Sequence, residues 1–190
     1  MIEKFFLLIT GIIILLLATE IFLEATTKNQ FFIRQPNRLF ILEPNKLYIR
    51  GIEGKTRFTV NSLGLRGDEL HHQEIRILAL GGSATECGYL DDSEAWPHLV
   101  QEHLARKTGR SVWVGNAGYS AHGTRHHILQ ITELLKQIQH IDLVIILIGA
   151  NETIAYFKPD YNPLGIDVPS LREHCLRDAF EVTPIKEGGG

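Results

Sequence analysis

A short apolar run that ends in Gly-Gly-Ser constrains this chain more than any other feature. The run covers residues 75–80, and the serine that follows the two glycines is Ser83. Runs of this length bounded by glycine are typical of buried strands in a parallel sheet. The pattern therefore places Ser83 at the C-terminal end of a strand, where open α/β sheets bind their ligands. A plain strand-turn-helix corner with an N-capping serine explains the same pattern without a function.

Two later segments repeat this organisation. The runs Val112–Val114 and Leu143–Ile148 are also short and apolar, and each leads into a turn of small residues: Asn116-Ala117-Gly118 and Gly149-Ala150-Asn151-Glu152. Because helical patterns separate the three runs, we expect parallel neighbouring strands. Their C-terminal ends then meet at one edge of the sheet. This edge would bring together one nucleophile and its hydrogen-bond donors, namely Ser83, Gly118 and Asn151.

The segments between the strands carry helical spacing. Apolar residues recur at this spacing from Trp96 to Leu104, after a helix start at residues 91–93, and again from about Thr124 to Ile138. The unbroken run over 143–148 favours a central strand that is buried on both faces. The alternation of strands and helices predicts right-handed crossovers in a doubly wound layer.

The three strand-turn segments resemble a known family. The motifs Gly81-Gly82-Ser83-Ala84-Thr85, Asn116-Ala117-Gly118 and Gly149-Ala150-Asn151-Glu152 resemble, in this order, the first three sequence blocks of the SGNH (GDSL-type) hydrolases. Residues 61–67 and 96–99 resemble a membrane-anchored bacterial branch of that family. The resemblance covers about residues 58–153. It implies a flavodoxin-like three-layer α/β/α sandwich with a parallel sheet.

The resemblance also implies acyl transfer from an ester. Ser83 Oγ would attack the ester carbonyl, while the N–H groups of Ser83 and Gly118 and the amide of Asn151 would stabilise the oxyanion. A serine hydroxyl needs a nearby base, which is usually a histidine held by a carboxylate. The family supplies both in an Asp-x-x-His block after the third block, and this chain has none there. Whether the chain is an active enzyme therefore stays open.

Other groups with suitable chemistry are weaker candidates. Residues 68–71 spell Asp-x-x-His but precede the nucleophile, so we assign them no catalytic role. Three histidines follow the second predicted strand, and a helix start with exposed histidines explains them better than a base does: His122, His126 and His127. His174 follows the third block, but Leu171 stands where the family has Asp. We interpret Cys87 as a small buried thiol.

The C-terminal part has fewer elements than the resemblance implies. Only three core strands can be counted, whereas the family's sheet normally has about five. A helix is predicted over residues 171–180, after a segment with several prolines. Open sheet edges are a liability. We therefore expect residues 75–190 to be an SGNH-like α/β domain that is incomplete and C-terminally truncated.

The N-terminus contains a long apolar run. The run covers residues 5–23 and is interrupted only by Thr10, Gly11, Thr19 and Glu20. At about 1.5 Å per residue it nearly spans a hydrocarbon core of roughly 30 Å. We expect residues 1–24 to be an uncleaved signal anchor, a single transmembrane helix, with the catalytic domain outside the cytoplasm; a cleaved signal peptide is the alternative. Residues 25–74 are expected to connect the two, with short strands at 47–49 and 58–60.

Composition limits the remaining functions. The chain of 190 residues has a formal net charge of −3 and lacks a basic patch, which argues against a nucleic-acid partner. Its two cysteines cannot form a disulfide framework, and no Cys/His spacing indicates a metal site or other cofactor. We expect an esterase or deacylase that acts on a small molecule, an acylated glycan or a lipid. The alternatives are an O-acyltransferase that modifies a cell-surface polymer and a catalytically inactive membrane-anchored fragment.

Overall fold

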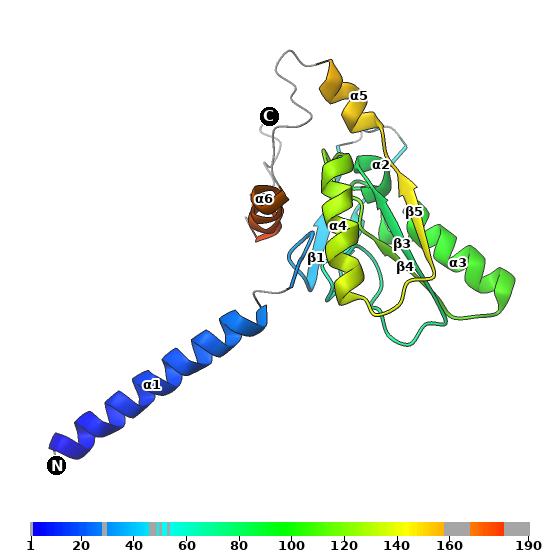
Figure 1. Ribbon diagram of the computed structural model, residues 1–190. Coiled ribbons are helices and arrows are strands. Elements are labelled where there is room, and N and C mark those ends of the chain that lie inside the picture. Colours follow the sequence, from blue (N-terminus) through cyan, green and yellow to red (C-terminus); the bar gives the residue numbers. More distant parts are fainter. Residues whose placement is uncertain are drawn as a thin grey trace. The chain divides into compact units, whose positions relative to one another are not determined.

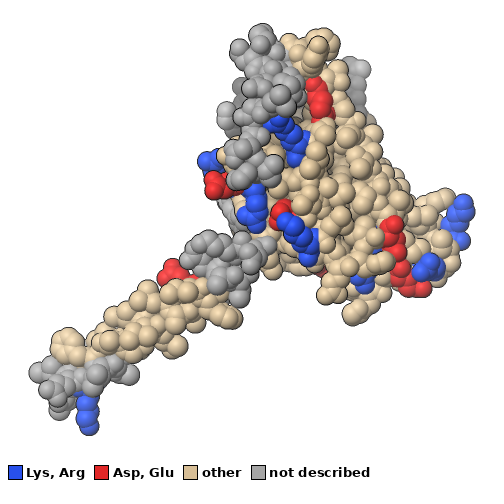
Figure 2. All heavy atoms as spheres, in the orientation of Figure 1, with Lys and Arg blue, Asp and Glu red and all other residues tan. Residues whose placement is uncertain are grey.

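The computed structural model describes residues 2–27, 30–45, 49, 51–52, 54–157 and 168–180. The chain divides into two units, residues 1–31 and 32–190. In the first unit, α1 (Ile2–Thr27) is the helix expected at the N-terminus, and Figure 2 shows no charged side chain along its middle on the face in view. Among the described residues, however, no helix is both long enough and apolar enough to cross a membrane. The transmembrane helix expected over residues 1–24 therefore has no support in the structure.

A parallel three-stranded sheet forms the centre of the second unit (Figure 1). Its strands are β3 (Ile75–Gly81), β4 (Val112–Asn116) and β5 (Leu143–Leu147), in the order β4-β3-β5. Both pairings are parallel. The three apolar runs of the sequence are therefore the three strands of this sheet, and the unit is a mixed α/β domain.

The prediction that the third strand is central and buried on both faces is wrong for the described strands. β5 pairs with β3 alone, and the side chains of Leu143, Ile146 and Leu147 are 51, 54 and 49% exposed. β3 takes the central place because β4 and β5 pair on its two sides. An unbroken apolar run therefore does not distinguish a central strand from an edge strand.

Helices cover the sheet. α3 (Trp96–Thr108) packs on the face that carries Ile77, Ala79 and Val114, and α4 (Thr124–Gln137) contacts β3. The β3-to-β4 and β4-to-β5 connections run in opposite directions across the sheet. Right-handed crossovers therefore place their helices on opposite faces, and Figure 1 shows α4 in front of the strands. This is the arrangement that the alternation of strands and helices predicts.

A two-stranded antiparallel hairpin precedes the main sheet. β1 (Arg38–Leu42) pairs with β2 (Thr56–Val60). β2 confirms the strand expected at residues 58–60, whereas the sequence pattern does not predict β1. Most of the strand expected at residues 47–49 lies outside the described residues. Arg66 forms single bridges with Val60 and with Asn116, so the segment after β2 joins the hairpin to β4.

Four short or peripheral helices complete the described part of the second unit: α2 (Ser83–Glu86), the 3-10 helix η1 (Asp92–Glu94), α5 (Ala150–Tyr156) and α6 (Val168–Phe180). Asp91 accepts a hydrogen bond from the N–H of Ser93 and caps η1. The helix start expected at residues 91–93 is therefore a separate turn, and α3 begins only at Trp96. α6 contains the helix predicted over residues 171–180.

Candidate active site

Ser83 is the first residue of α2, and Gly82 alone separates it from the end of β3. Its side chain is exposed, and its Oγ hydrogen-bonds to none of the residues that the structure describes. Gly81 makes this corner possible, because a Cβ there would lie 2.6 Å from the carbonyl oxygen of Leu147 and would also meet the side chain of Thr85. The missing side chain lets α2 fold back onto the end of the sheet and present Ser83 to solvent.

Asn151 lies against Gly82, the residue before Ser83, at the end of the sheet. It is the second residue of α5, and a Cβ on Gly82 would lie 2.7 Å from its Nδ2. The same nitrogen donates a hydrogen bond of 2.7 Å to the backbone oxygen of His122. An amide nitrogen carries two hydrogens. The bond to His122 therefore fixes the Asn151 side chain and leaves one hydrogen for a ligand.

Gly118 reaches the same region from β4. It packs against α2 so closely that a Cβ would lie 2.6 Å from the carbonyl carbon of Thr85. Its N–H donates to Asn116 Oδ1 at 2.9 Å, and its carbonyl oxygen accepts a hydrogen bond from Arg34 Nη2. The structure thus brings the three predicted residues to one edge, but the N–H of Gly118 already has an acceptor within the protein.

Asn116 is a positioning residue that the sequence reasoning missed. Its side chain is buried; besides accepting from Gly118, it donates from Nδ2 to the carbonyl oxygen of Thr85 at 2.8 Å. One side chain therefore ties the turn after β4 to the helix that carries Ser83. The sequence did contain a signal for this role, because Asn116 is a polar residue at the end of an apolar strand and belongs to the motif Asn116-Ala117-Gly118.

Arg34 and Glu86 form a second link to the same turn. Arg34 Nη2 lies 2.6 Å from Glu86 Oε1, and Glu86 Oε2 accepts a hydrogen bond of 2.8 Å from the N–H of Ser120. The guanidinium group also lies over the rings of Phe58 and Tyr119. α2 and the turn after β4 are thus held by a largely buried ion pair. Arg34 lies upstream of the family resemblance, so no motif pointed to it.

The expectation of exposed histidines after β4 is wrong. His122 and His127 are buried and His126 is half-buried. The His122 ring stacks between those of Tyr119 and His126. Burial, assisted by the neighbouring His126 and His127, lowers the pKa of His122 to about 2. Such an imidazole accepts a proton poorly, so His122 does not suit the role of general base.

Glu152 connects the start of α4 to the start of α5. Its carboxylate accepts hydrogen bonds from the N–H and hydroxyl of Thr124 and, at 3.1 Å, from the N–H of Gly149. Partial burial acts to raise the pKa of Glu152, but these hydrogen bonds outweigh it and hold the pKa below its ordinary value of 4.5. Glu152 therefore supports the loops around Asn151.

Replacing Glu152 by glutamine should make the free energy of unfolding depend less on pH in the acid range. Because the folded-state pKa is lowered, the carboxylate stabilises the fold above the unfolded-state value of 4.5 and loses this effect as the pH falls through the folded-state pKa. In urea unfolding, the stability difference between the parent chain and Glu152→Gln should be larger at pH 7 than at pH 3. The exposed Glu102→Gln serves as the control. A difference of equal size at both pH values would contradict this role.

Replacing Gly118 by alanine should destabilise the protein by about 1–3 kcal/mol. The new methyl group would collide with the backbone of α2 at Thr85 and Glu86, which cannot move aside as a side chain could. Gly88→Ala is a matched control, because the nearest atom to its Cβ would lie 3.8 Å away, and we expect a change within about 0.5 kcal/mol. Urea unfolding measures both. Equal effects would contradict the close packing at Gly118.

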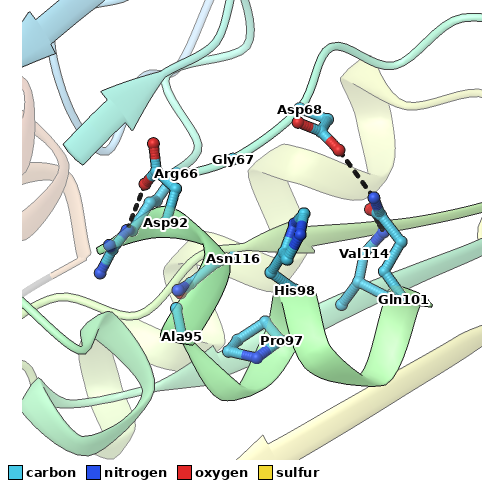
Figure 3. A pocket seen from close by; sticks show the side chains of 10 residues that line it. All are labelled: Arg66, Gly67, Asp68, Asp92, Ala95, Pro97, His98, Gln101, Val114 and Asn116. Carbon is cyan, nitrogen blue, oxygen red and sulfur yellow. Dashed lines mark hydrogen bonds and ion pairs between the residues drawn. The ribbon is translucent and has the colours of Figure 1, made fainter. Parts of the chain in front are cut away.

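A pocket beside the start of α3 is separate from these residues (Figure 3). It is lined by Arg66, Gly67, Asp68, Asp92, Ala95, Pro97, His98, Gln101, Val114 and Asn116. Arg66 pairs with Asp92 at 3.0 Å, and Gln101 donates to Asp68 at 2.7 Å. These four side chains therefore pair with one another. Neither Ser83 nor Asn151 lines the pocket.

No protein-family model and no curated protein matches the chain. Among solved structures, the chain is similar to AlinE4, an SGNH-hydrolase family esterase, and to two variants of AlinE4. For each of the three, the identity is 22%, the TM-score is 0.41, and the match covers 58% of this chain and 53% of the other. The chain thus spans about half the length of these structures. A similarity of this degree assigns no activity, so the functional assignment rests on the site itself.

Proposed function

We propose that the chain is a serine hydrolase of the SGNH type that cleaves ester bonds. The supporting observation is the contact of Asn151 with Gly82, the residue before Ser83, at the C-terminal ends of β3 and β5. The order β4-β3-β5 corresponds to the first three strands of the flavodoxin-like order, in which ligands bind where the strand order reverses. Ser83 and Asn151 follow the two strands that flank this point. The exposed Ser83 hydroxyl therefore belongs to the residue next to the glycine that contacts Asn151, whose amide has one hydrogen available.

The proposed reaction begins with attack of Ser83 Oγ on the ester carbonyl carbon, as its proton passes to a general base. The resulting oxyanion accepts hydrogen bonds from the N–H of Ser83, at the start of α2, and from the second amide hydrogen of Asn151. The N–H of Gly118 becomes a third donor to the oxyanion when its hydrogen bond to Asn116 Oδ1 breaks. The intermediate expels the alcohol and leaves the acyl group on Ser83. Water then attacks this acyl group and releases the acid.

We propose an acylated glycan or lipid as the natural substrate. Ser83 is exposed at the edge of the sheet, and an open nucleophile suits an ester that is carried on a large molecule. An O-acyltransferase on the same scaffold would use a sugar hydroxyl in place of water. A location outside the cytoplasm stays a prediction from the family resemblance.

A catalytically inactive domain is the second candidate. One observation favours it: no described residue hydrogen-bonds to Ser83 Oγ as a base would. Such a domain would bind an acylated molecule at the same edge without turnover. It predicts that substitutions at Ser83 leave the behaviour of the chain toward esters unchanged.

Hydrolysis of aryl esters by the purified full chain tests these alternatives. A series of acyl chains from acetyl upward measures the acyl preference, and an added acceptor sugar tests for acyl transfer by analysis of the products. The hydrolase proposal predicts release of the free acid. Acylated sugar should form only if the chain is an acyltransferase. If the chain is shown to be folded and turns over none of the esters, both catalytic alternatives are contradicted and the inactive domain is favoured.

Replacing Asn151 by alanine should lower kcat for the best ester by about 10²–10³-fold, the usual cost of losing one oxyanion donor. The substitution also removes the bond to the His122 carbonyl oxygen, so circular dichroism must show that the fold is retained. Thr153→Ala is the control, because Thr153 is exposed on the same helix and, among the described residues, its hydroxyl bonds only to the carbonyl oxygen of Gly149. Equal rates for both variants would exclude Asn151 as an oxyanion donor.

A further inference from the structure

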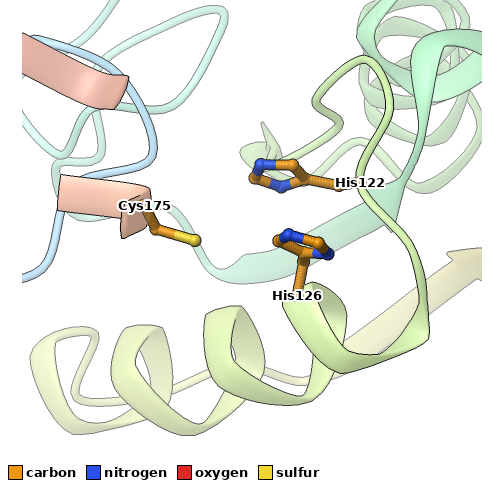
Figure 4. Close-up of side chains that lie close together, drawn as sticks. All are labelled: His122, His126 and Cys175. Carbon is orange, nitrogen blue, oxygen red and sulfur yellow. The ribbon is translucent and has the colours of Figure 1, made fainter. Parts of the chain in front are cut away.

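Three side chains with metal-binding chemistry meet beside the candidate active site. His122 precedes α4, His126 lies in its first turn, and Cys175 belongs to α6. One donor atom of each lies within 4.8 Å of those of the other two. Figure 4 shows the two imidazole rings stacked on each other, with the sulfur of Cys175 directed toward them.

We propose that His122, His126 and Cys175 bind a zinc ion. Imidazole nitrogen and thiolate sulfur are ligands that Zn²⁺ prefers, and three protein ligands leave the fourth tetrahedral position for water. Mg²⁺ and Ca²⁺ require oxygen ligands, which these three side chains do not offer. This proposal does not depend on the hydrolase function.

The distances between the donors allow the site to close. A tetrahedral Zn²⁺ with bonds of about 2.0–2.3 Å holds its ligand atoms roughly 3.3–3.8 Å apart. The donors therefore need to approach by about 1–1.5 Å, which is within reach of rotations about side-chain bonds. His122 and Cys175 are 8% and 3% exposed, so the ion would be largely shielded from water.

Gln130 is placed to orient His122. Its side chain is fully buried, with Nε2 2.8 Å from His122 Nδ1 and Oε1 3.0 Å from His127 Nδ1. The amide can present either its nitrogen or its oxygen to His122. With the oxygen toward His122, it accepts the Nδ1–H and leaves Nε2 with the lone pair that a metal needs. This is the arrangement typical of zinc-bound histidines.

His126 has to give up one hydrogen bond to bind zinc. Its Nδ1 accepts a hydrogen bond of 3.2 Å from the N–H of Gly123, which leaves the ring hydrogen on Nε2. Either nitrogen can bind zinc only after this bond breaks, because the nitrogen that binds the metal needs its lone pair and the other nitrogen then carries the hydrogen. The ion would join α6 to the turn before α4, in which the carbonyl oxygen of His122 holds the amide of Asn151. Zinc would therefore stabilise the surroundings of the candidate active site without taking part in the reaction.

Zinc binding to the full chain tests this proposal. Competition with a chromophoric chelator should show one zinc ion per chain. Cys175→Ala and His126→Gln should each weaken binding by at least about 100-fold, and Gln130→Met by about 10–100-fold. Cys87→Ser is the matched control and should bind as the parent does, because Cys87 lies outside the cluster.

Cobalt in place of zinc gives a second readout. The parent chain and Cys87→Ser should show thiolate-to-cobalt charge-transfer absorption, which Cys175→Ala should lose. His126→Gln, at a half-buried position, keeps the test valid if Cys175→Ala fails to fold by circular dichroism. No stoichiometric zinc, or unchanged affinity in folded His126→Gln or Cys175→Ala, would overturn the proposal.

Discussion

Replacing Ser83 by alanine should lower kcat for ester hydrolysis by at least about 10³-fold. In the proposed reaction, Ser83 Oγ is the atom that bonds to the acyl group, and alanine removes only this atom. The free energy of unfolding should change by no more than about 0.5 kcal/mol, because the exposed hydroxyl bonds to no described residue and alanine suits a helix. Loss of activity with unchanged stability would separate a chemical role from a structural one.

Ser93→Ala is the control for this substitution. Ser93 is also exposed and lies in a short helical turn, where its hydroxyl bonds to Asp91. We expect Ser93→Ala to keep the parent kcat. A Ser83→Ala variant with more than a tenth of the parent activity, or equal losses in the two variants, would contradict the assignment of Ser83 as the nucleophile.

Replacing Arg66 by methionine should lower the free energy of unfolding by about 3–5 kcal/mol. Arg66 is 1% exposed, and its Nε donates to Asp92 Oδ1 at 3.0 Å. Its two terminal nitrogens donate to three backbone carbonyl oxygens at 2.6–2.7 Å, those of Glu86, Cys87 and Leu90. Methionine can fill similar space but leaves the buried Asp92 carboxylate and the three carbonyl oxygens without these donors.

Arg57→Met is a matched control, because Arg57 pairs with the same carboxylate. Its Nε lies 3.6 Å from Asp92 Oδ2, but its side chain is 61% exposed. An exposed ion pair of this kind contributes at most about 1 kcal/mol. Urea unfolding of the two variants measures the difference. Losses of equal size would show that Arg66 stabilises the fold through charge alone rather than through its buried hydrogen bonds.

The Arg66 contacts also explain the structural role of residues 61–67. The three carbonyl oxygens belong to the last residue of α2, the helix with Ser83 at its start, and to the loop that follows it. The N–H and carbonyl oxygen of Arg66 bond to the backbone of Asn116 in β4. One residue therefore connects the upstream hairpin, the sheet and the helix that begins at Ser83.

Local pattern was sufficient to predict the core strands and the sheet edge at which they meet. The apolar runs before Gly81, Asn116 and Gly149 became parallel strands, because alternation with helical segments leaves few other arrangements. The same reasoning placed Ser83 and Asn151 at one edge. These features depend on residues close together in the sequence.

Features that depend on distant residues could not be predicted in this way. Arg34 and Glu86 are 52 positions apart in the sequence, and Cys175 comes near His122 and His126 only after the chain has folded. The position of β5 in the sheet depends on which strand pairs beside it rather than on its own apolar run. Burial of His122 follows from stacking and packing partners, which a helix-start pattern does not contain.

Covalent labelling of Ser83 tests the central claim most directly. The folded full chain would be treated with a fluorophosphonate, which reacts with activated serine hydroxyls, and peptide mass spectrometry would locate the adduct. The proposed hydrolase predicts a single adduct on Ser83 that disappears when the chain is unfolded before treatment. An unlabelled Ser83 in the folded chain, or labelling of other serines to the same extent, would show that Ser83 is not an activated nucleophile.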